Sequence, residues 1–160
     1  MPVLSVISAL DASGNRLFVN IVSCGWDRAL KVDLNVLAEQ APKIPDGFCD
    51  SRYAFLANTH PVLQQQMIAC LKSPKLIVAD TMNLWIDRTR ADLEKVLARA
   101  DLLFINDEES RQLTGERQVA NAASAIIEMG PKYVVIKRGE HGALLFARDF
   151  CLFVPAVPLR

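Results

Sequence analysis

The pattern of hydrophobic and polar positions changes at about residue 53. Before that point, residues 3–9 and 16–23 are rich in Val, Ile and Leu, and they flank the turn-forming residues 11–15. This arrangement is typical of a β-hairpin. Residues 26–50 show no regular period and contain two prolines and a glycine, which indicates an irregular connection with a short helical turn at residues 34–37.

From residue 53 onward, short apolar runs alternate with stretches of helical period. In one such stretch Leu93, Val96 and Leu97 share a helix face, and Thr89 with Asp92 three residues later predicts an N-cap. We expect buried strands at residues 53–57, 75–79, 102–105 and 133–136, helices at residues 61–71, 89–100, 107–113 and 119–129, and a terminal hairpin of residues 143–146 and 151–154.

Strands that alternate with helices favour an α/β fold. Strands that are apolar throughout are typical of a sheet covered on two sides. We therefore expect a Rossmann-like, mainly parallel sheet with helices on both faces over residues 51–160, preceded by a hairpin and a connection in residues 1–50. An unrelated doubly wound domain would show the same pattern, and it stays an alternative.

Composition narrows the class of protein further. The 160 residues are 51% hydrophobic and 22% charged, values that fit a globular domain and exclude disorder. Lys plus Arg and Asp plus Glu each total 18, which speaks against nucleic acid as a partner. Without an apolar run of 18 residues, a membrane span is not expected either. Four scattered cysteines in no metal-binding spacing favour free thiols and a cytoplasmic location.

Polar residues follow several of the predicted strands. In parallel sheets, ligands bind outside the carboxyl ends of the strands. That rule selects five residues for a candidate site, namely Asn58, Asp80, Asn83, Asn106 and Lys137.

Asn106 and Glu109 allow two interpretations. Asparagine is a good helix N-cap, and acidic residues in a first turn complement the helix dipole. Alternatively, the Glu109 carboxylate would hold Mg²⁺ through water molecules, and the Asn106 amide would meet a phosphate group. The spacing of these residues does not decide between the two.

The loop after the last predicted parallel strand, residues 137–142, is also ambiguous. Gly139 and Gly142 are expected in a tight turn that requires positive φ angles. Beside Lys137 and Arg138, two glycines would also let backbone N–H groups approach a phosphate or a purine closely. The loop is not a P-loop, and the sequence gives little support for a hydrolase triad.

Taken together, residues 76–86, 101–109 and 134–143 resemble three segments of the ribokinase-like (PfkB) family of carbohydrate and nucleoside kinases, in matching order and separation. The resemblance is good over residues 52–160. It is looser over the opening hairpin, where that family has a β-lid over the sugar site.

This resemblance implies phosphoryl transfer from ATP, with Mg²⁺, to a hydroxyl of a small-molecule sugar or nucleoside. It assigns Asn106 and Glu109 to the family's N-x-x-E motif, with Glu109 supporting the metal. Lys137, Gly139, Glu140 and Gly142 are assigned to the loop that lines the ATP site. Asn58, Asp80 and Asn83 are placed on the side of the substrate or the phosphates.

The sequence departs from the family pattern in one important respect. The family's catalytic base lies in a Gly-rich D-T-x-G-A-G-D-type segment, which the 160 residues do not contain. We therefore name no catalytic residue and expect a central fragment, truncated at both ends, that is inactive by itself. A non-catalytic α/β module that binds a nucleotide or a sugar is the alternative, and a homodimer through the lid hairpin is a further expectation.

Overall fold

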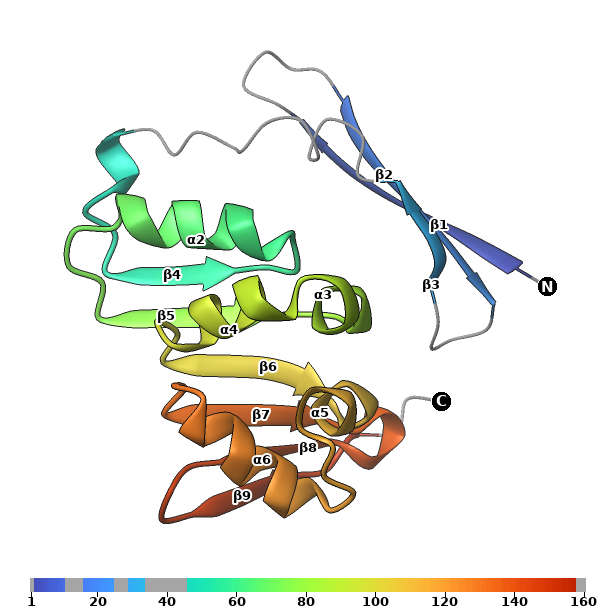
Figure 1. Cartoon of the computed structure of the whole chain (residues 1–160), viewed down its shortest axis with the longest axis vertical. Coiled ribbons are helices and arrows are strands. Elements are labelled where there is room, and N and C mark those ends of the chain that lie inside the picture. Colours follow the sequence, from blue (N-terminus) through green and yellow to red (C-terminus); the bar gives the residue numbers. More distant parts are fainter. Residues whose placement is uncertain (1, 11–15, 25–28, 34–45, 158–160) are drawn as a thin grey trace. The chain divides into compact units, whose positions relative to one another are not determined.

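The computed structural model describes residues 2–10, 16–24, 29–33 and 46–157 (Figure 1). The chain forms two compact units, residues 1–43 and 44–160. The first contains an antiparallel sheet of β1 (Pro2–Leu10), β2 (Arg16–Cys24) and β3 (Ala29–Asp33), in that order. The predicted hairpin is confirmed, whereas the predicted turn at residues 11–15 and helical turn at 34–37 lie outside the described residues.

The second unit is built around a six-stranded sheet whose order is the order of the chain. Its first four strands are parallel, and the last two are antiparallel to their neighbours. This arrangement confirms a mainly parallel α/β sheet. The strands are β4 (Tyr53–Leu56), β5 (Leu76–Asp80), β6 (Leu102–Asn106), β7 (Tyr133–Lys137), β8 (Ala143–Phe146) and β9 (Cys151–Val154).

Five α-helices accompany these strands within residues 46–157. They are α2 (Pro61–Cys70), α3 (Asn83–Arg88), α4 (Arg90–Leu97), α5 (Asp107–Thr114) and α6 (Val119–Glu128), and two short 3₁₀ turns, Asp46–Phe48 and Gly139–His141, complete the unit. The expected single helix over residues 89–100 is shorter, and Thr89 does not cap it with its side chain. Its hydroxyl instead donates to the carbonyl of Trp85 in the preceding helix.

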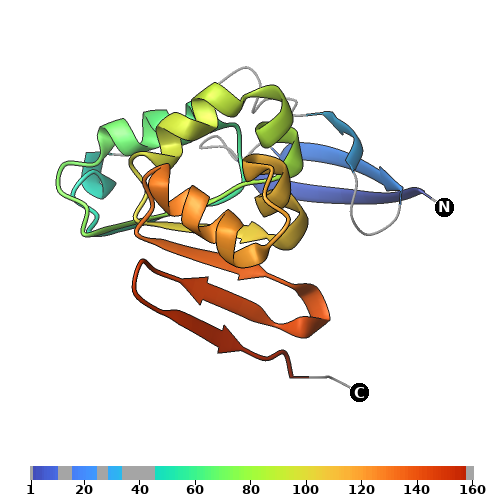
Figure 2. The same ribbon diagram turned by 60° about the horizontal axis from the view of Figure 1, so that its bottom comes forward.

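The helices of the second unit lie on one side of the sheet (Figure 2). The hydrophobic core therefore forms between that side and the helices, where alternate strand residues such as Ile77, Leu103 and Ile136 are almost completely buried. We expected helices on both faces of the sheet, but within the described residues the helices cover one face only. The apolar pattern of the strands indicated two buried faces, but it did not show which segment covers the second.

The second face of the sheet is apolar and partly open within the described part of the chain. Tyr53 and Phe55 on β4 are 67% and 60% exposed, and Phe55 meets Phe104 of β6 edge to face with ring centroids 6.4 Å apart. The expectation that residues 53–57 form a buried strand is therefore wrong for this face of β4. In the same described residues, no helix combines the length and the hydrophobicity that a membrane span requires.

Candidate functional site

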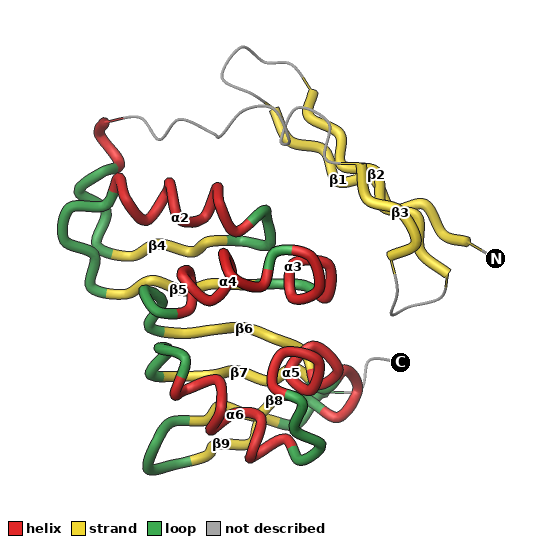
Figure 3. The backbone as a smooth tube through the Cα atoms, in the orientation of Figure 1, coloured by secondary structure: helices red, strands yellow, loops and turns green. Residues whose placement is uncertain are grey.

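The parallel strands β4 to β7 end at the same edge of the sheet, where loops lead into the helices (Figure 3). Asp80, Asn106 and Lys137 are the last residues of β5, β6 and β7. The Lys137 ammonium lies 3.5 Å from Asp80 Oδ1, although β6 separates their strands. This ion pair spans the end of β6, so the structure brings together three of the five strand-end residues that the sequence selected.

A buried glutamine holds the ends of β4 and β5 in place. Gln64 on α2 is 1% exposed, and its Nε2 donates to the carbonyl oxygens of Leu56, Ala57 and Asp80 at 3.3, 3.1 and 3.0 Å. Leu56 and Asp80 are the last residues of β4 and β5, and Ala57 directly follows β4. Sequence reasoning missed Gln64, because a glutamine in a helix is usually expected on the solvent side.

Asn106 and Glu109 form a complete capping box at the start of α5. Asn106 Oδ1 accepts from the Glu109 N–H at 2.7 Å, and Glu109 Oε2 accepts from the Asn106 N–H at 3.0 Å. The structural interpretation of this pair is therefore confirmed. It uses one oxygen of each side chain and leaves Asn106 Nδ2 and Glu109 Oε1 outside the box, so a ligand-binding role is compatible with it.

The Glu109 carboxylate lies in an unusual electrostatic position for a residue at a helix start. Burial raises the pKa of Glu109, while the hydrogen bond from the Asn106 N–H and the charge of Lys137 act in the opposite direction. The negative charges of Asp80 and Glu108 raise the pKa further. A second cation beside Glu109 would therefore stabilise its ionised form.

The loop after β7 is a tight turn that depends on glycine. Gly139 and Gly142 have φ angles of 55° and 86°, and the Gly142 N–H donates to the Gly139 carbonyl at 3.1 Å. The turn interpretation is confirmed by these angles. The Gly142 N–H is already used within the loop, so any ligand contact from this backbone would come from another residue.

A pocket of about 360 Å³ opens beside this loop. Its walls come from the loop itself and from the chain that follows β9. The lining residues are Arg138, Glu140, His141, Phe153, Pro155 and Ala156.

Asn58 and Asn83, which the sequence also selected, form hydrogen bonds within the protein. Asn58 Oδ1 accepts from the indole N–H of Trp85 at 2.8 Å, which attaches the loop after β4 to α3. Asn83 is the first residue of α3, and its Oδ1 accepts from the Leu84 N–H at 2.9 Å. These contacts give both side chains a structural role, and for Asn58 and Asn83 the assignment to the substrate or phosphate side stays a prediction.

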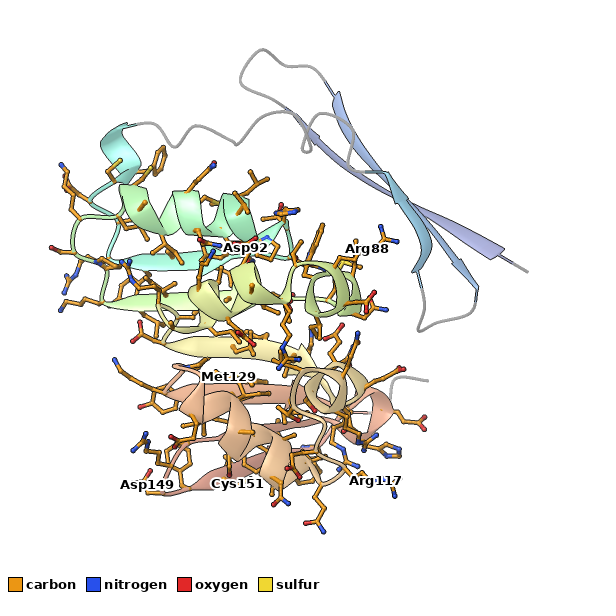
Figure 4. All side chains as sticks on the ribbon, in the orientation of Figure 1. Arg88, Asp92, Arg117, Met129, Asp149 and Cys151 are labelled. Carbon is orange, nitrogen blue, oxygen red and sulfur yellow. The ribbon has the colours of Figure 1, made fainter. Side chains whose placement is uncertain are left out.

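The acidic residue nearest the end of the chain lies away from the candidate site. Asp149 is in the turn between β8 and β9, at the opposite edge of the sheet from Arg88 and Arg117 (Figure 4). Within the described residues, no three His, Cys, Asp or Glu side chains are grouped to hold a metal ion. Mg²⁺ commonly binds through one or two carboxylates, water molecules and substrate phosphates, and the single carboxylate of Glu109 fits that mode.

Comparison with known proteins places this arrangement in context. Residues 51–160 match the family described as "pfkB family carbohydrate kinase". The cytidine kinase of Thermococcus kodakarensis is 29% identical over 119 residues, which are 73% of this chain and 42% of the relative. The chain therefore spans less than half the length of that relative.

Solved structures show the same fold. A putative ribokinase II from Escherichia coli in complex with ATP and Mg²⁺ gives a TM-score of 0.64 at 18% identity, covering 92% of this chain and 49% of that one. A PfkB protein from Polaromonas sp. JS666 gives 0.62 at 20% identity, with 72% and 44% covered. The family match covers more than two thirds of the residues, and we conclude that this chain belongs to the pfkB family of carbohydrate kinases.

Proposed function

We propose that residues 106–109 and 137–142 form the nucleotide side of an ATP-dependent kinase that phosphorylates a hydroxyl of a sugar or a nucleoside. The observation that carries this proposal is the Lys137–Asp80 ion pair across the end of β6. It places an ammonium group beside the N-x-x-E helix start, at the sheet edge where ligands of parallel α/β folds bind.

The chemistry of phosphoryl transfer suits these side chains. Such catalysis depends mainly on positioning the reactants and stabilising negative charge, with little covalent participation of the protein. The Lys137 ammonium, half exposed at 47%, supplies a positive charge for the phosphates, and Asp80 restrains its position. Asn106 Nδ2 supplies a neutral donor for a phosphate oxygen.

Glu109 is the residue that would hold Mg²⁺, through its oxygen outside the capping box and intervening water molecules. Bound Mg²⁺ would neutralise charge on the nucleotide phosphates. Support for this cofactor comes from the putative ribokinase II structure with ATP and Mg²⁺.

For the molecule that accepts the phosphate group, we propose a class, a nucleoside or a sugar. One relative is named a cytidine kinase and one structural neighbour a putative ribokinase II, which supports a nucleoside or a sugar equally. We also propose that the sheet of β1 to β3 acts as the lid of the whole protein and joins two copies in a homodimer, as the resemblance implies. A cytoplasmic location belongs to the same set of proposals.

Isothermal titration of the 160-residue chain with Mg-ATP tests the nucleotide site. Asn106→Asp keeps an oxygen that caps α5, because aspartate is as good an N-cap as asparagine, but it replaces the amide donor by a second negative oxygen. We expect saturable binding to the original chain and at least about tenfold weaker binding to this variant, as for loss of a hydrogen bond to a charged group.

The matched control is Asn121→Asp, the same chemical change at an exposed position of α6. It should bind Mg-ATP like the original chain. Equal binding by all three proteins would disprove the assignment of Asn106. The 160 residues contain no D-T-x-G-A-G-D-type segment, and we propose that the chain by itself binds the nucleotide without transferring phosphate to cytidine or ribose.

A further inference from the structure

Asp107, the first residue of α5, lies between two arginines. Its Oδ2 accepts from Arg111 on the same helix at 3.0 Å, and it lies 4.0 Å from Nε of Arg138 in the loop after β7. The other carboxylate oxygen, Oδ1, and Arg138 Nε are both buried without a hydrogen-bond partner among the described residues. Two groups of opposite charge from separate motifs thus lie about one ångström beyond hydrogen-bond distance.

Arg138 also lines the 360 Å³ pocket. A guanidinium group has five N–H donors in a planar fork. A guanidinium group whose Nε faces a carboxylate at 4.0 Å keeps its terminal nitrogens for bidentate binding of a planar or tetrahedral anion. The pocket combines this guanidinium group with apolar walls from Phe153 and Pro155. The Glu140 carboxylate also lines it, but lies 3.8 Å from His141, which leaves Arg138 as the group that would bind an anion attached to a larger ligand.

We propose that Asp107 is a positioning residue that holds Arg138 in the pocket wall, where the Arg138 guanidinium binds the phosphate groups of the nucleotide. The inference rests on the proposed function for the identity of the ligand. It adds a contact between the start of α5 and the loop after β7, so that the two motifs form one phosphate-binding unit. Arg138 belongs to the loop of residues 137–142 that the sequence already pointed to, whereas Asp107 was not selected from the sequence.

The geometry argues against a purely structural role for this pair. Arg111 already satisfies Asp107 Oδ2 within the helix, so α5 does not need Arg138 for its own stability. Partly exposed ion pairs contribute little to folding, and Arg138 is 37% exposed. The larger effect of Asp107 is to remove rotational freedom from a long side chain before a ligand arrives, which lowers the entropy cost of binding.

The test measures three probes on the 160-residue chain: Mg-ATP, inorganic tripolyphosphate and adenosine. Arg138→Gln should weaken binding of both phosphate probes about tenfold, and Asp107→Asn about threefold. The double variant should be no weaker than Arg138→Gln alone, because Asp107 acts only through Arg138. Adenosine should bind all variants within about twofold, a result that a general loss of structure would not give.

Arg111→Gln is the matched control, because it removes the other partner of Asp107. It should leave all three affinities within about twofold of the original chain. If it reproduces the effect of Asp107→Asn, or if the effects of Asp107→Asn and Arg138→Gln simply add, the positioning role is wrong.

The probes also separate this inference from the proposed function. Arg138-dependent binding of tripolyphosphate without binding of Mg-ATP would keep the inference that the pocket binds phosphate and overturn the kinase site. Binding of Mg-ATP that is insensitive to Asp107 and Arg138 would overturn the inference alone. Absence of binding for both phosphate probes would overturn both.

Discussion

Replacement of Gly142 by alanine should unfold the second unit at markedly lower denaturant concentration. A Cβ at this position would lie 2.1 Å from the carbonyl oxygen of Val154 and 2.8 Å from the backbone nitrogen of Ala156. These are backbone atoms, so rotation of a side chain cannot relieve the contact. The φ and ψ angles of 86° and −143° lie in a region that essentially only glycine adopts and add about 1–3 kcal/mol for any residue with a Cβ, and overpacking adds about 1–3 kcal/mol, for a total loss of about 2–6 kcal/mol.

Gly139→Ala is the matched comparison, since Gly139 has a φ angle of 55° but no heavy atom within 4 Å of the position that an alanine methyl group would take. It should lose only the conformational part, about 1–2 kcal/mol. Urea unfolding followed by circular dichroism measures both losses. Equal losses would refute the inference that the loop after β7 is packed tightly against the chain that follows β9. The result also matters for binding studies, because a Gly142 variant would lose ligands through unfolding, whereas Gly139→Ala should remain folded.

Three further predictions concern the rest of the second unit. Glu109→Gln keeps the capping box and removes a carboxyl whose pKa is raised in the folded state. Proton binding stabilises the original chain at low pH, and this contribution is lost as pH rises above about 4.5, so the stability of the variant relative to the original chain should increase between pH 4 and 7 in urea titrations. A difference in stability that stays constant with pH would contradict this. Gln64→Leu leaves three carbonyls without their donor and should cost about 2 kcal/mol, whereas Gln66→Leu at an exposed position of the same helix should change stability by less than about 0.5 kcal/mol. Phe55→Ser should lower the fluorescence of the apolar dye ANS bound to the folded chain, with little change in the urea midpoint, because Phe55 is 60% exposed on the open sheet face. Phe150→Ser, on the turn between β8 and β9, is the control, and unchanged dye binding by Phe55→Ser would show that the dye binds elsewhere.

Much of the second unit follows from local sequence alone. The apolar runs and helical periods of residues 53–154 predict each strand to within a residue or two, since strand and helix differ clearly in period there. The strand β3 is not predicted, although Leu30 and Val32 alternate with polar neighbours. Periodicity could not reveal the open face of the sheet, because an apolar strand residue carries no mark of the segment that covers it.

For the candidate site, the sequence predicts which residues lie at the ends of the strands better than it predicts which side chains contact one another. The rule for parallel sheets correctly brings Asp80, Asn106 and Lys137 to one edge. The rule does not distinguish these three residues from Asn58, whose side chain accepts a hydrogen bond from Trp85. The roles of Gln64 and Asp107 depend on partners 16 and 31 residues away in the chain, and such distant pairings leave no local pattern in a single sequence.

The order of the six strands has a consequence for how the second unit folds. Each strand from β4 to β9 pairs with the strand that directly precedes or follows it in the chain, so no pairing has to bridge more than one connection. The antiparallel pairings of β7 to β9 close short turns at little entropic cost, whereas each parallel pairing has to close a longer connection that contains a helix, which is slower. The sheet is therefore expected to start with the antiparallel strands β7 to β9 and to add β6, β5 and β4 in turn, so the ion pair between β5 and β7 forms only after both β6 and β5 have joined.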